Sequence, residues 1–251
     1  MAEVKKEVAI KQETGVVSWE EQLKHLAFAT AESEKPAGNW VSFKSGVLTI
    51  GGNPMKGNKV EMIVLHSVFE NQMYANKYDA NNPQPPICYA LGETDDELAP
   101  HADSAKPQAT SCAVCPNNDW GSDPGGGRGK ACKNTRRLGI IAAPDAKDAV
   151  NVAKAEVAMA KLPVTSVKNW ATYANQVVNA LHLPPLAVIT EMELSPDPKT
   201  QIQVNFRLVD KILDSGVLQA LLKKRGDIHS IMYAPYDKPS ETPALATDRK
   251  Y

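Results

Sequence analysis

The four cysteines carry the most specific chemical signal in the sequence. They are Cys88, Cys112, Cys115 and Cys132, and the 251-residue chain has no others. Two residues separate Cys112 from Cys115, a spacing at which two thiolates reach one metal ion from a single turn, and the outer cysteines complete a set of four sulfurs. Structural zinc sites are closed, four-coordinate and rich in thiolate, so the pattern predicts one structural Zn²⁺ held by all four cysteines.

Other uses of the same four thiols remain open at this stage. Two disulfides would satisfy the count, but the N-terminus lacks the apolar stretch of a secretory signal, and disulfides rarely persist in a reducing compartment. A redox pair at Cys112 and Cys115 leaves the two flanking cysteines unexplained. An iron–sulfur cluster uses the same ligands. His101 would substitute for Cys88 if Cys88 were a buried strand residue.

The segment between Cys88 and Cys132 has the composition of a loop that a metal holds in place. It is rich in Pro, Asn, Asp, Ser and Gly and offers few apolar side chains to bury. Its glycine-rich part superficially suggests a phosphate-binding loop. The Walker pattern, however, requires glycine where Pro124 stands and Ser or Thr where Ala131 stands.

Overall composition indicates a folded protein and excludes several classes. Hydrophobic residues make up 43% of the chain and charged residues 23%, both near the globular average, so global disorder and fibrous structure do not fit. The sequence contains no apolar run near the ~20 residues that a membrane-spanning helix needs. We therefore expect a soluble, intracellular protein without a membrane partner.

The charges are unevenly distributed along the chain. In total, 28 Lys and Arg nearly balance 29 Asp and Glu. Residues 79–103 contain six acids and no Lys or Arg, whereas residues 125–137 contain five bases and no acid. The charges predict a surface with separate acidic and basic regions. A net charge near zero therefore does not exclude a polyanionic partner.

Periodicity predicts a mainly β protein of α+β class, with helices in its C-terminal half. Strands of a small barrel or sandwich are expected around a hairpin at 39–51 and at 59–69, 86–91, 137–143, 186–194 and 201–209. An amphipathic helix follows Thr165 or Ser166 and ends before Pro184, and a last helix covers 210–224.

Three regions are expected along the chain. Residues 1–35 form an N-terminal segment with a short helix at 19–31, residues 36–232 form the main domain with the cysteine loop inserted at about 88–132, and residues 233–251 form a flexible, proline-containing tail.

The order of several motifs resembles a family of tailed-bacteriophage proteins that are similar to single-stranded DNA-binding proteins. The motifs span about residues 40 to 210. They are Tyr74 with Tyr78-Asp79, Pro86-Ile87-Cys88, Cys112-Ala113-Val114-Cys115-Pro116 before Trp120-Gly121-Ser122, Gly129-Lys130-Ala131-Cys132 before Arg136-Arg137-Leu138, and Leu162-Pro163-Val164-Thr165-Ser166 before Trp170 and Tyr173.

This resemblance implies an oligonucleotide-binding (OB) barrel with an inserted zinc loop. It also implies sequence-tolerant binding of single-stranded DNA in phage replication or recombination, phage replication proteins as further partners, and the cytoplasm of an infected bacterium as the location. Many single-strand binders end in an acidic tail that recruits partners. Here the acids after Tyr236 are balanced by bases, so this mode of recruitment is in doubt.

Single-strand binding needs basic groups for phosphates and aromatic faces for bases, and both kinds of residue surround the cysteines. The candidate nucleic-acid residues are Arg128, Lys130, Lys133, Arg136, Arg137, Trp120, Tyr74, Tyr78 and Tyr89. Four other aromatic residues sit in apolar periodic patterns and are expected in the core, namely Trp40, Phe43, Trp170 and Phe206.

Two other functional classes are alternatives to DNA binding. A zinc-stabilised structural or assembly protein of a phage, without nucleic-acid binding, is the first alternative, and near neutrality favours it. Catalysis is not expected, because the five histidines are scattered and the sequence contains no HExxH, GxSxG or zinc-deaminase motif.

Overall fold

A computed structural model describes residues 18–24, 26, 39–76 and 84–236. The chain divides into two compact units, Met1–Ala37 and Gly38–Tyr251, and each is considered by itself.

The first unit contains a helix over residues 19–24 whose N-terminus is capped by two reciprocal hydrogen bonds. The Ser18 hydroxyl accepts a hydrogen bond from the Glu21 backbone N–H, and the Glu21 carboxylate accepts one from the Ser18 N–H, each at 3.2 Å. This reciprocal capping box explains why the helix begins where the sequence predicted. Residues 25 and 27–31 of the expected helix lie outside the described residues.

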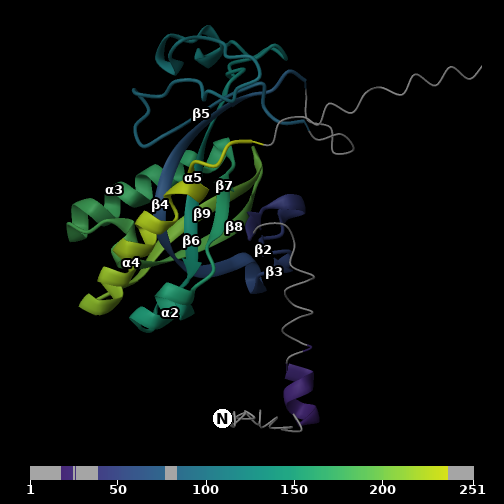
Figure 1. The fold of residues 1–251 in the computed structure, drawn as a ribbon. Helices are drawn as coiled ribbons and strands as arrows, with labels where there is room; N and C mark the ends of the chain where they lie inside the picture. Colours follow the sequence, from purple (N-terminus) through teal and green to yellow (C-terminus); the bar gives the residue numbers. More distant parts are fainter. Residues whose placement is uncertain (1–17, 25, 27–38, 77–83, 237–251) are drawn as a thin grey trace, which may run out of the picture. The chain divides into compact units, whose positions relative to one another are not determined.

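The second unit is built on one curled, mixed sheet that forms a half-barrel (Figure 1). In the described part of the chain the sheet has nine strands in the order β3-β2-β1-β7-β6-β4-β8-β9, with β5 paired to β4. All pairs are antiparallel except β1 with β7. The strands are β1 (Trp40–Ser42), β2 (Thr49–Ile50), β3 (Asn53–Pro54), β4 (Lys59–Met73), β5 (Cys88–Gly92), β6 (Lys133–Ala142), β7 (Ala158–Leu162), β8 (Val188–Asp197) and β9 (Gln201–Lys211).

Short helices connect and cover these strands, so the fold is α+β and mainly β, as the sequence predicted. The α-helices are α2 (Ala149–Lys154), α3 (Val167–Leu181), α4 (Ser215–Asp227) and α5 (His229–Met232). The 3₁₀ turns are η1 (Lys44–Gly46), η2 (Lys56–Asn58), η3 (Cys112–Val114), η4 (Pro116–Asn118), η5 (Ala143–Ala146), η6 (Val164–Ser166) and η7 (Pro185–Ala187).

Strand β4 organises the sheet because it has different neighbours along its length. It pairs with β6 from Met62 to Gln72, with β8 at its beginning (59–62) and with β5 at its end (69–73). A bulge between Val64 and His66 interrupts the register with β6 at the centre. Both faces of the strand are buried, which explains its nearly continuous apolar run in place of alternation.

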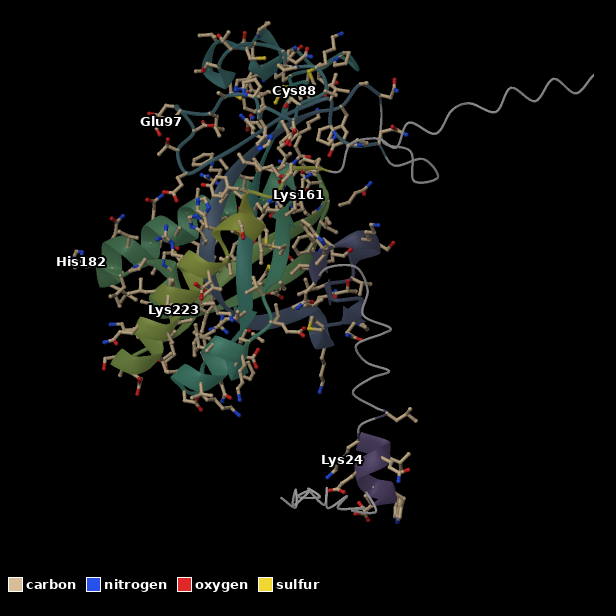
Figure 2. The ribbon with its side chains drawn as sticks, in the orientation of Figure 1. Lys24, Cys88, Glu97, Lys161, His182 and Lys223 are labelled. Carbon is tan, nitrogen blue, oxygen red and sulfur yellow. The ribbon has the colours of Figure 1, made fainter. Side chains whose placement is uncertain are left out.

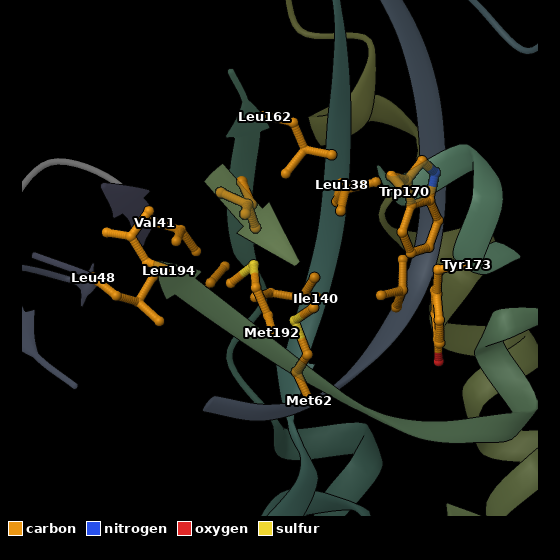
Figure 3. Packing of buried hydrophobic residues seen from close by; sticks show 14 of the residues in the cluster. Val41, Leu48, Met62, Leu138, Ile140, Leu162, Trp170, Tyr173, Met192 and Leu194 are labelled. Carbon is orange, nitrogen blue, oxygen red and sulfur yellow. The ribbon is translucent and has the colours of Figure 1, made fainter. Parts of the chain in front are cut away.

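The concave face of the half-barrel holds the larger hydrophobic core, which α3 covers (Figure 3). Trp170, Tyr173 and Val177 recur at helical spacing on the buried face of α3. Where β9 meets the start of α3, the Val204 N–H donates to the Ser166 hydroxyl at 2.9 Å and Asn169 donates to the Val204 carbonyl at 3.1 Å. These bonds satisfy polar groups on the edge of β9.

The opposite face of the sheet packs against α2, α4 and α5 in a second core. Gly139 of β6 lies directly beneath α5, since a β-carbon built there would stand 2.8 Å from both Ile228 Cδ1 and Met232 Sδ. Only glycine permits this close approach of helix and strand.

We expect Asp214→Ala to lower the free energy of unfolding by about 1 kcal/mol. The Asp214 carboxylate caps α4 by accepting the Val217 N–H at 2.8 Å, and alanine leaves that donor without its partner. Urea denaturation of the two proteins measures the difference. Asp210→Ala is the control, because the Asp210 carboxylate accepts only the N–H of its neighbour Lys211 among the side-chain hydrogen bonds of the described residues; an equal loss there would contradict the capping role.

Several predicted element boundaries were wrong. Strand β4 continues to Met73 because Glu70, Asn71 and Gln72 are buried in spite of their polarity. The last long helix begins at Ser215, where its cap lies, and not at residue 210, which belongs to β9. Strand β7 and helix α2 were not predicted, because a six-residue helix and a five-residue strand are too short to display a clear period.

Within residues 233–236, which the sequence assigned to a flexible tail, the two tyrosines contact the main domain. Tyr233 contacts the second core, and the Tyr236 hydroxyl donates to Glu70 Oε1 at 2.6 Å. The remainder of the expected tail, 237–251, lies outside the described residues.

Of the four aromatic residues expected in the core, Trp40 was predicted wrongly, because it is 46% exposed. Phe43 and Trp170 are buried and Phe206 packs against the core, as expected.

Candidate metal centre and nucleic-acid interface

The segment between β5 and β6 stands at one end of the sheet and is organised by backbone hydrogen bonds (Figure 1). Leu98 is its buried anchor and packs with Ala90, Cys112 and Phe69. The Cys112 N–H donates to the Leu98 carbonyl at 2.9 Å, and the Cys132 N–H donates to the Asn117 carbonyl at 2.8 Å. The cluster of side chains that packs here is small, so backbone hydrogen bonds help to position the loop.

All four cysteines line one small cavity. Cys88, Cys112, Cys115 and Cys132 are among the residues around a space of about 10 Å³, close to the minimum that holds one water molecule. The first three are buried and Cys132 is half-buried, and all four are free thiols. Figure 2 labels Cys88, the first residue of β5, among the loop segments at the top of the view.

The thiols are close enough to influence one another electrostatically. Burial, and then the neighbouring Cys112, Cys115 and Cys88, raise the pKa of the Cys132 thiol to about 12. Burial likewise raises the pKa of Cys88 and of Cys112, each with a smaller contribution from neighbouring cysteines. Negative charge on one thiolate therefore disfavours charge on the others, a situation that a bound cation reverses.

The donor set suits a thiolate-bound metal, although the described residues do not form a complete ligand shell. Four thiolate sulfurs are the donor set that zinc prefers, and all four cysteines line the same cavity. In the described part of the chain, no three His, Cys, Asp or Glu side chains are arranged as a group that could hold a metal ion. Zinc binding by these cysteines accordingly stays a prediction.

His101 is placed away from the thiol cavity and has other partners. Its ring stacks on Tyr89, its Nδ1 lies 2.9 Å from the Tyr89 hydroxyl, and the Asp103 N–H donates to the same nitrogen at 3.1 Å. His101 was expected to act as a ligand only if Cys88 did not, and Cys88 itself lines the cavity. The arrangement favours the four cysteines over a set that includes His101.

Trp120 is the most exposed aromatic residue of the loop, with 79% of its surface accessible. The Lys130 ammonium stands 5.2 Å from the centre of its ring and donates to Asn118 Oδ1 at 3.3 Å. Arg128, on the same loop, is exposed. An indole face beside a lysine ammonium can stack on a planar group and neutralise nearby anions.

Lys133 and Arg136 are held by partners within the protein. The Lys133 ammonium forms an ion pair with Asp123 at 2.6 Å and donates to the Lys130 carbonyl at 2.6 Å. The Arg136 guanidinium lies over the Phe69 ring, and burial lowers its pKa to about 10. Both are partly accessible at the beginning of β6, so they extend the basic surface only at its margin.

Two of the predicted nucleic-acid residues are buried instead. Arg137 is 4% exposed and pairs with Glu70, while its guanidinium also donates to the carbonyls of Met232 and Ala234 at 3.0 and 3.2 Å. Tyr89 is 2% exposed, between the rings of His101 and Tyr236. Neither side chain reaches solvent, so their assignment to a DNA surface is corrected.

Tyr74 and Tyr78 are the remaining tyrosines that the sequence assigned to the nucleic-acid surface. Tyr74 is 37% exposed and donates a hydrogen bond to Gln72 at 2.6 Å, and burial and then Glu70 raise its pKa to about 12. Tyr78 lies outside the described residues.

A buried polar network that the sequence analysis missed lies beneath the loop. Glu70 accepts from Tyr236 and Arg137, and Lys161 of β7 donates to Gln72 and, at 3.3 Å, to the Tyr236 hydroxyl. Burial lowers the pKa of Lys161. Alternation along β6 and β7 could have indicated that Arg137 and Lys161 face inward, but the sequence contains no signal that pairs them with Glu70.

The fold and the site define an α+β protein in which a curled half-barrel carries a loop with an exposed tryptophan, and in which four cysteines line one small cavity. Comparison with family models, curated proteins and solved structures gives no match. None of the helices in the described part of the chain combines the length and apolar character needed to cross a bilayer.

Proposed function

We propose that the protein binds single-stranded DNA with little sequence preference, as part of a phage replication or recombination system. Binding is stoichiometric and involves no catalysis. The observation that carries the proposal is the exposed Trp120 ring with the Lys130 ammonium 5.2 Å from its centre, together with the exposed Arg128 on the same loop, because stacking on an aromatic face beside cationic groups is how sequence-tolerant single-strand binders work.

The half-barrel is consistent with an OB-type scaffold for this surface. Its long, bulged β4 pairs with different strands at its two ends, and the cysteine loop is inserted between two neighbours of that strand. In the proposed arrangement the four cysteines hold one structural Zn²⁺, which fixes the loop and presents Trp120, Lys130 and Arg128 together. When bound, the metal supplies cross-linking of the loop and no reaction chemistry.

We propose DNA contacts only for residues whose side chains are exposed or partly exposed. Trp120, Lys130 and Arg128 form the centre, with Tyr74, Lys133 and Arg136 at the margin. Arg137 and Tyr89 leave the set because they are buried.

We expect Trp120→Ala to weaken binding of a dT oligonucleotide by roughly 5- to 100-fold, since one base stack contributes ~1 to 3 kcal/mol. Fluorescence anisotropy of a labelled oligonucleotide at low and moderate salt measures the loss. Trp19→Ala is a matched control, because Trp19 is similarly exposed, at 69%, on the N-terminal unit. Wild-type protein that does not bind even at low salt would refute the proposal.

A second candidate is a phage structural or assembly protein in which zinc only stabilises the loop. The exposure of Val114, at 72%, on the same loop as Trp120 favours it, because two exposed apolar side chains suit a protein partner. Sedimentation velocity with and without oligonucleotide separates the two: self-association that DNA does not alter supports the assembly role.

A further inference from the structure

A buried asparagine beside the cysteines has a hydrogen-bond donor without a partner. Asn71, in β4, is 2% exposed and lines the same small cavity as the four cysteines. Its side-chain nitrogen Nδ2 is buried and has no hydrogen-bond partner among the described residues. Because a buried donor left unsatisfied is destabilising, its position indicates that this cavity is built to present an acceptor.

The orientation of the Asn71 amide is set by a chain of side chains that begins at Asn118. The Lys130 ammonium can only donate, and it donates to Asn118 Oδ1 at 3.3 Å. The Cys112 carbonyl can only accept, and it accepts from Asn118 Nδ2 at 3.0 Å. These two partners fix which end of the Asn118 amide is oxygen and which is nitrogen.

Asn134 of β6 passes this orientation on to Asn71, which lies opposite it on β4. Asn134 Nδ2 donates to Asn118 Oδ1 at 2.9 Å and to Asn71 Oδ1 at 2.6 Å. Rotation of the Asn71 amide by half a turn would bring two donor nitrogens together, so its oxygen stays on Asn134. The nitrogen of Asn71 is therefore the free end of the chain.

Cys112 is the cysteine that the Asn71 side chain approaches. Burial raises the pKa of the Cys112 thiol, and the Asn71 side chain lowers it. A neutral thiol is a weak hydrogen-bond acceptor, whereas a charged acceptor forms a strong hydrogen bond. The free thiol thus leaves the amide without a good partner, and a thiolate at the same place would satisfy it.

Backbone donors face two of the other thiols in a similar way. Burial raises the pKa of Cys88, and the Gln108 N–H opposes this effect. Burial and the neighbouring cysteines raise the pKa of Cys132, and the Gln72 N–H opposes them. These donors stabilise the charged form of sulfur, which is the form that ligates a metal.

We propose that Asn71 is a positioning residue of the metal centre, and that its side-chain amide donates a hydrogen bond to the sulfur of metal-bound Cys112. The inference rests on the zinc site of the proposed function. When Cys112 releases its proton to solvent and becomes a ligand, the unpaired Nδ2 of Asn71 gains its acceptor. Such a partner orients the ligand and withdraws part of its charge, and loss of one typically lowers metal affinity by about 10- to 100-fold.

Asn71→Leu removes the donor and keeps a side chain of similar size. We expect its zinc affinity, measured by competition with a chromogenic chelator, to fall by about 10- to 100-fold. With Co²⁺ in place of zinc, the sulfur-to-metal charge-transfer bands should move to longer wavelength, because a sulfur that accepts one hydrogen bond fewer gives up charge more easily. A general loss of stability would not shift these bands.

Two further variants separate a donor role from a structural one. Asn71→Thr keeps a hydroxyl that can donate to sulfur and accept from Asn134, so it should retain most of the zinc affinity. Gln72→Leu is the matched control: Gln72 is the next residue of β4 and is 1% exposed, but its side chain donates to Thr135 and its backbone N–H is unchanged by the substitution. This control should leave the cobalt spectrum unchanged.

A measurement on the wild type does not depend on the stability of any variant. In ¹⁵N-labelled protein, a side-chain amide proton of Asn71 should shift downfield and exchange more slowly with solvent when zinc is added. Both changes should reverse when the zinc is chelated. An Asn71 amide that does not respond to zinc would contradict the hydrogen bond.

Two other results would also overturn the inference. They are equal zinc affinity with an equal cobalt spectrum in wild type and Asn71→Leu, and an Asn71→Thr variant that is no better than Asn71→Leu in both measurements. Wild-type protein that binds neither metal would remove the zinc site and this role together. Protein that binds zinc with the expected dependence on Asn71 but binds no oligonucleotide would refute the proposed DNA function alone.

Discussion

Replacement of Glu70 by glutamine should lower the free energy of unfolding by about 3–5 kcal/mol, because it leaves a buried guanidinium without its counter-charge. Glu70 is fully buried and pairs with Arg137, whose side chain is 5% exposed. The Tyr236 hydroxyl donates to the same carboxylate, so the substitution also weakens the attachment of residues 233–236.

Urea denaturation followed by circular dichroism measures the loss. Asp227→Asn is the matched control: it breaks the exposed pair between Lys223 and Asp227 on α4, and exposed pairs of this kind contribute only about 0.3–0.5 kcal/mol. A double replacement, Glu70→Leu with Arg137→Met, should recover most of the lost stability because no charge stays buried. A loss below about 1 kcal/mol in Glu70→Gln would contradict the buried ion pair.

The same network shows where sequence patterns fail. Residues 70–72 of β4 are Glu, Asn and Gln, a polar run that indicates the end of a strand, yet all three are buried. Their burial depends on partners 63 to 67 residues later in the chain, such as Thr135 and Arg137. A local window contains no information about such partners.

Adjacent residues of the same type can also differ in burial, as Arg136 and Arg137 do. Arg136 and Arg137 are neighbours in β6, so the pleat sends them to opposite faces: one lies over Phe69 near the loop and the other pairs with Glu70 inside. Sequence could predict the strand and its basic character, but not which arginine would be buried. Trp40 was misassigned because a three-residue strand gives too little alternation to identify its exposed face.

Elements with a strong local pattern were predicted well. Helix α3 has its apolar face at helical spacing and ends before Pro184, and the β8–β9 hairpin alternates on both sides of its turn. The cysteine spacing predicted a shared metal site, and the four cysteines line one cavity, although the chain between them has almost no regular structure. Metal binding there stays a prediction, because no three metal-ligating side chains of the described residues form a group that could hold an ion.

The largest effect on the loop should come from Cys115→Ser. If one zinc ion cross-links the four thiols, loss of one thiolate releases the metal, and with it part of the roughly 10–16 kcal/mol that structural zinc contributes in small sites. The hydrophobic cores of the sheet are formed by other residues, so the half-barrel should remain folded while residues 93–132 loosen. We expect amide hydrogen exchange in this loop to accelerate by at least about 100-fold, equivalent to ~3 kcal/mol.

Elemental analysis of freshly purified protein provides the decisive measurement, with one zinc per chain expected in the wild type and less than about a tenth in Cys115→Ser. His101→Gln is the matched control: His101 lies on the same loop but bonds to Tyr89 and Asp103, so its variant should retain the metal. Chelation of wild-type zinc should reproduce the exchange pattern of Cys115→Ser. Iron in place of zinc would reassign the site to a cluster, and substoichiometric metal together with slow exchange in the loop would mean that backbone hydrogen bonds alone hold it.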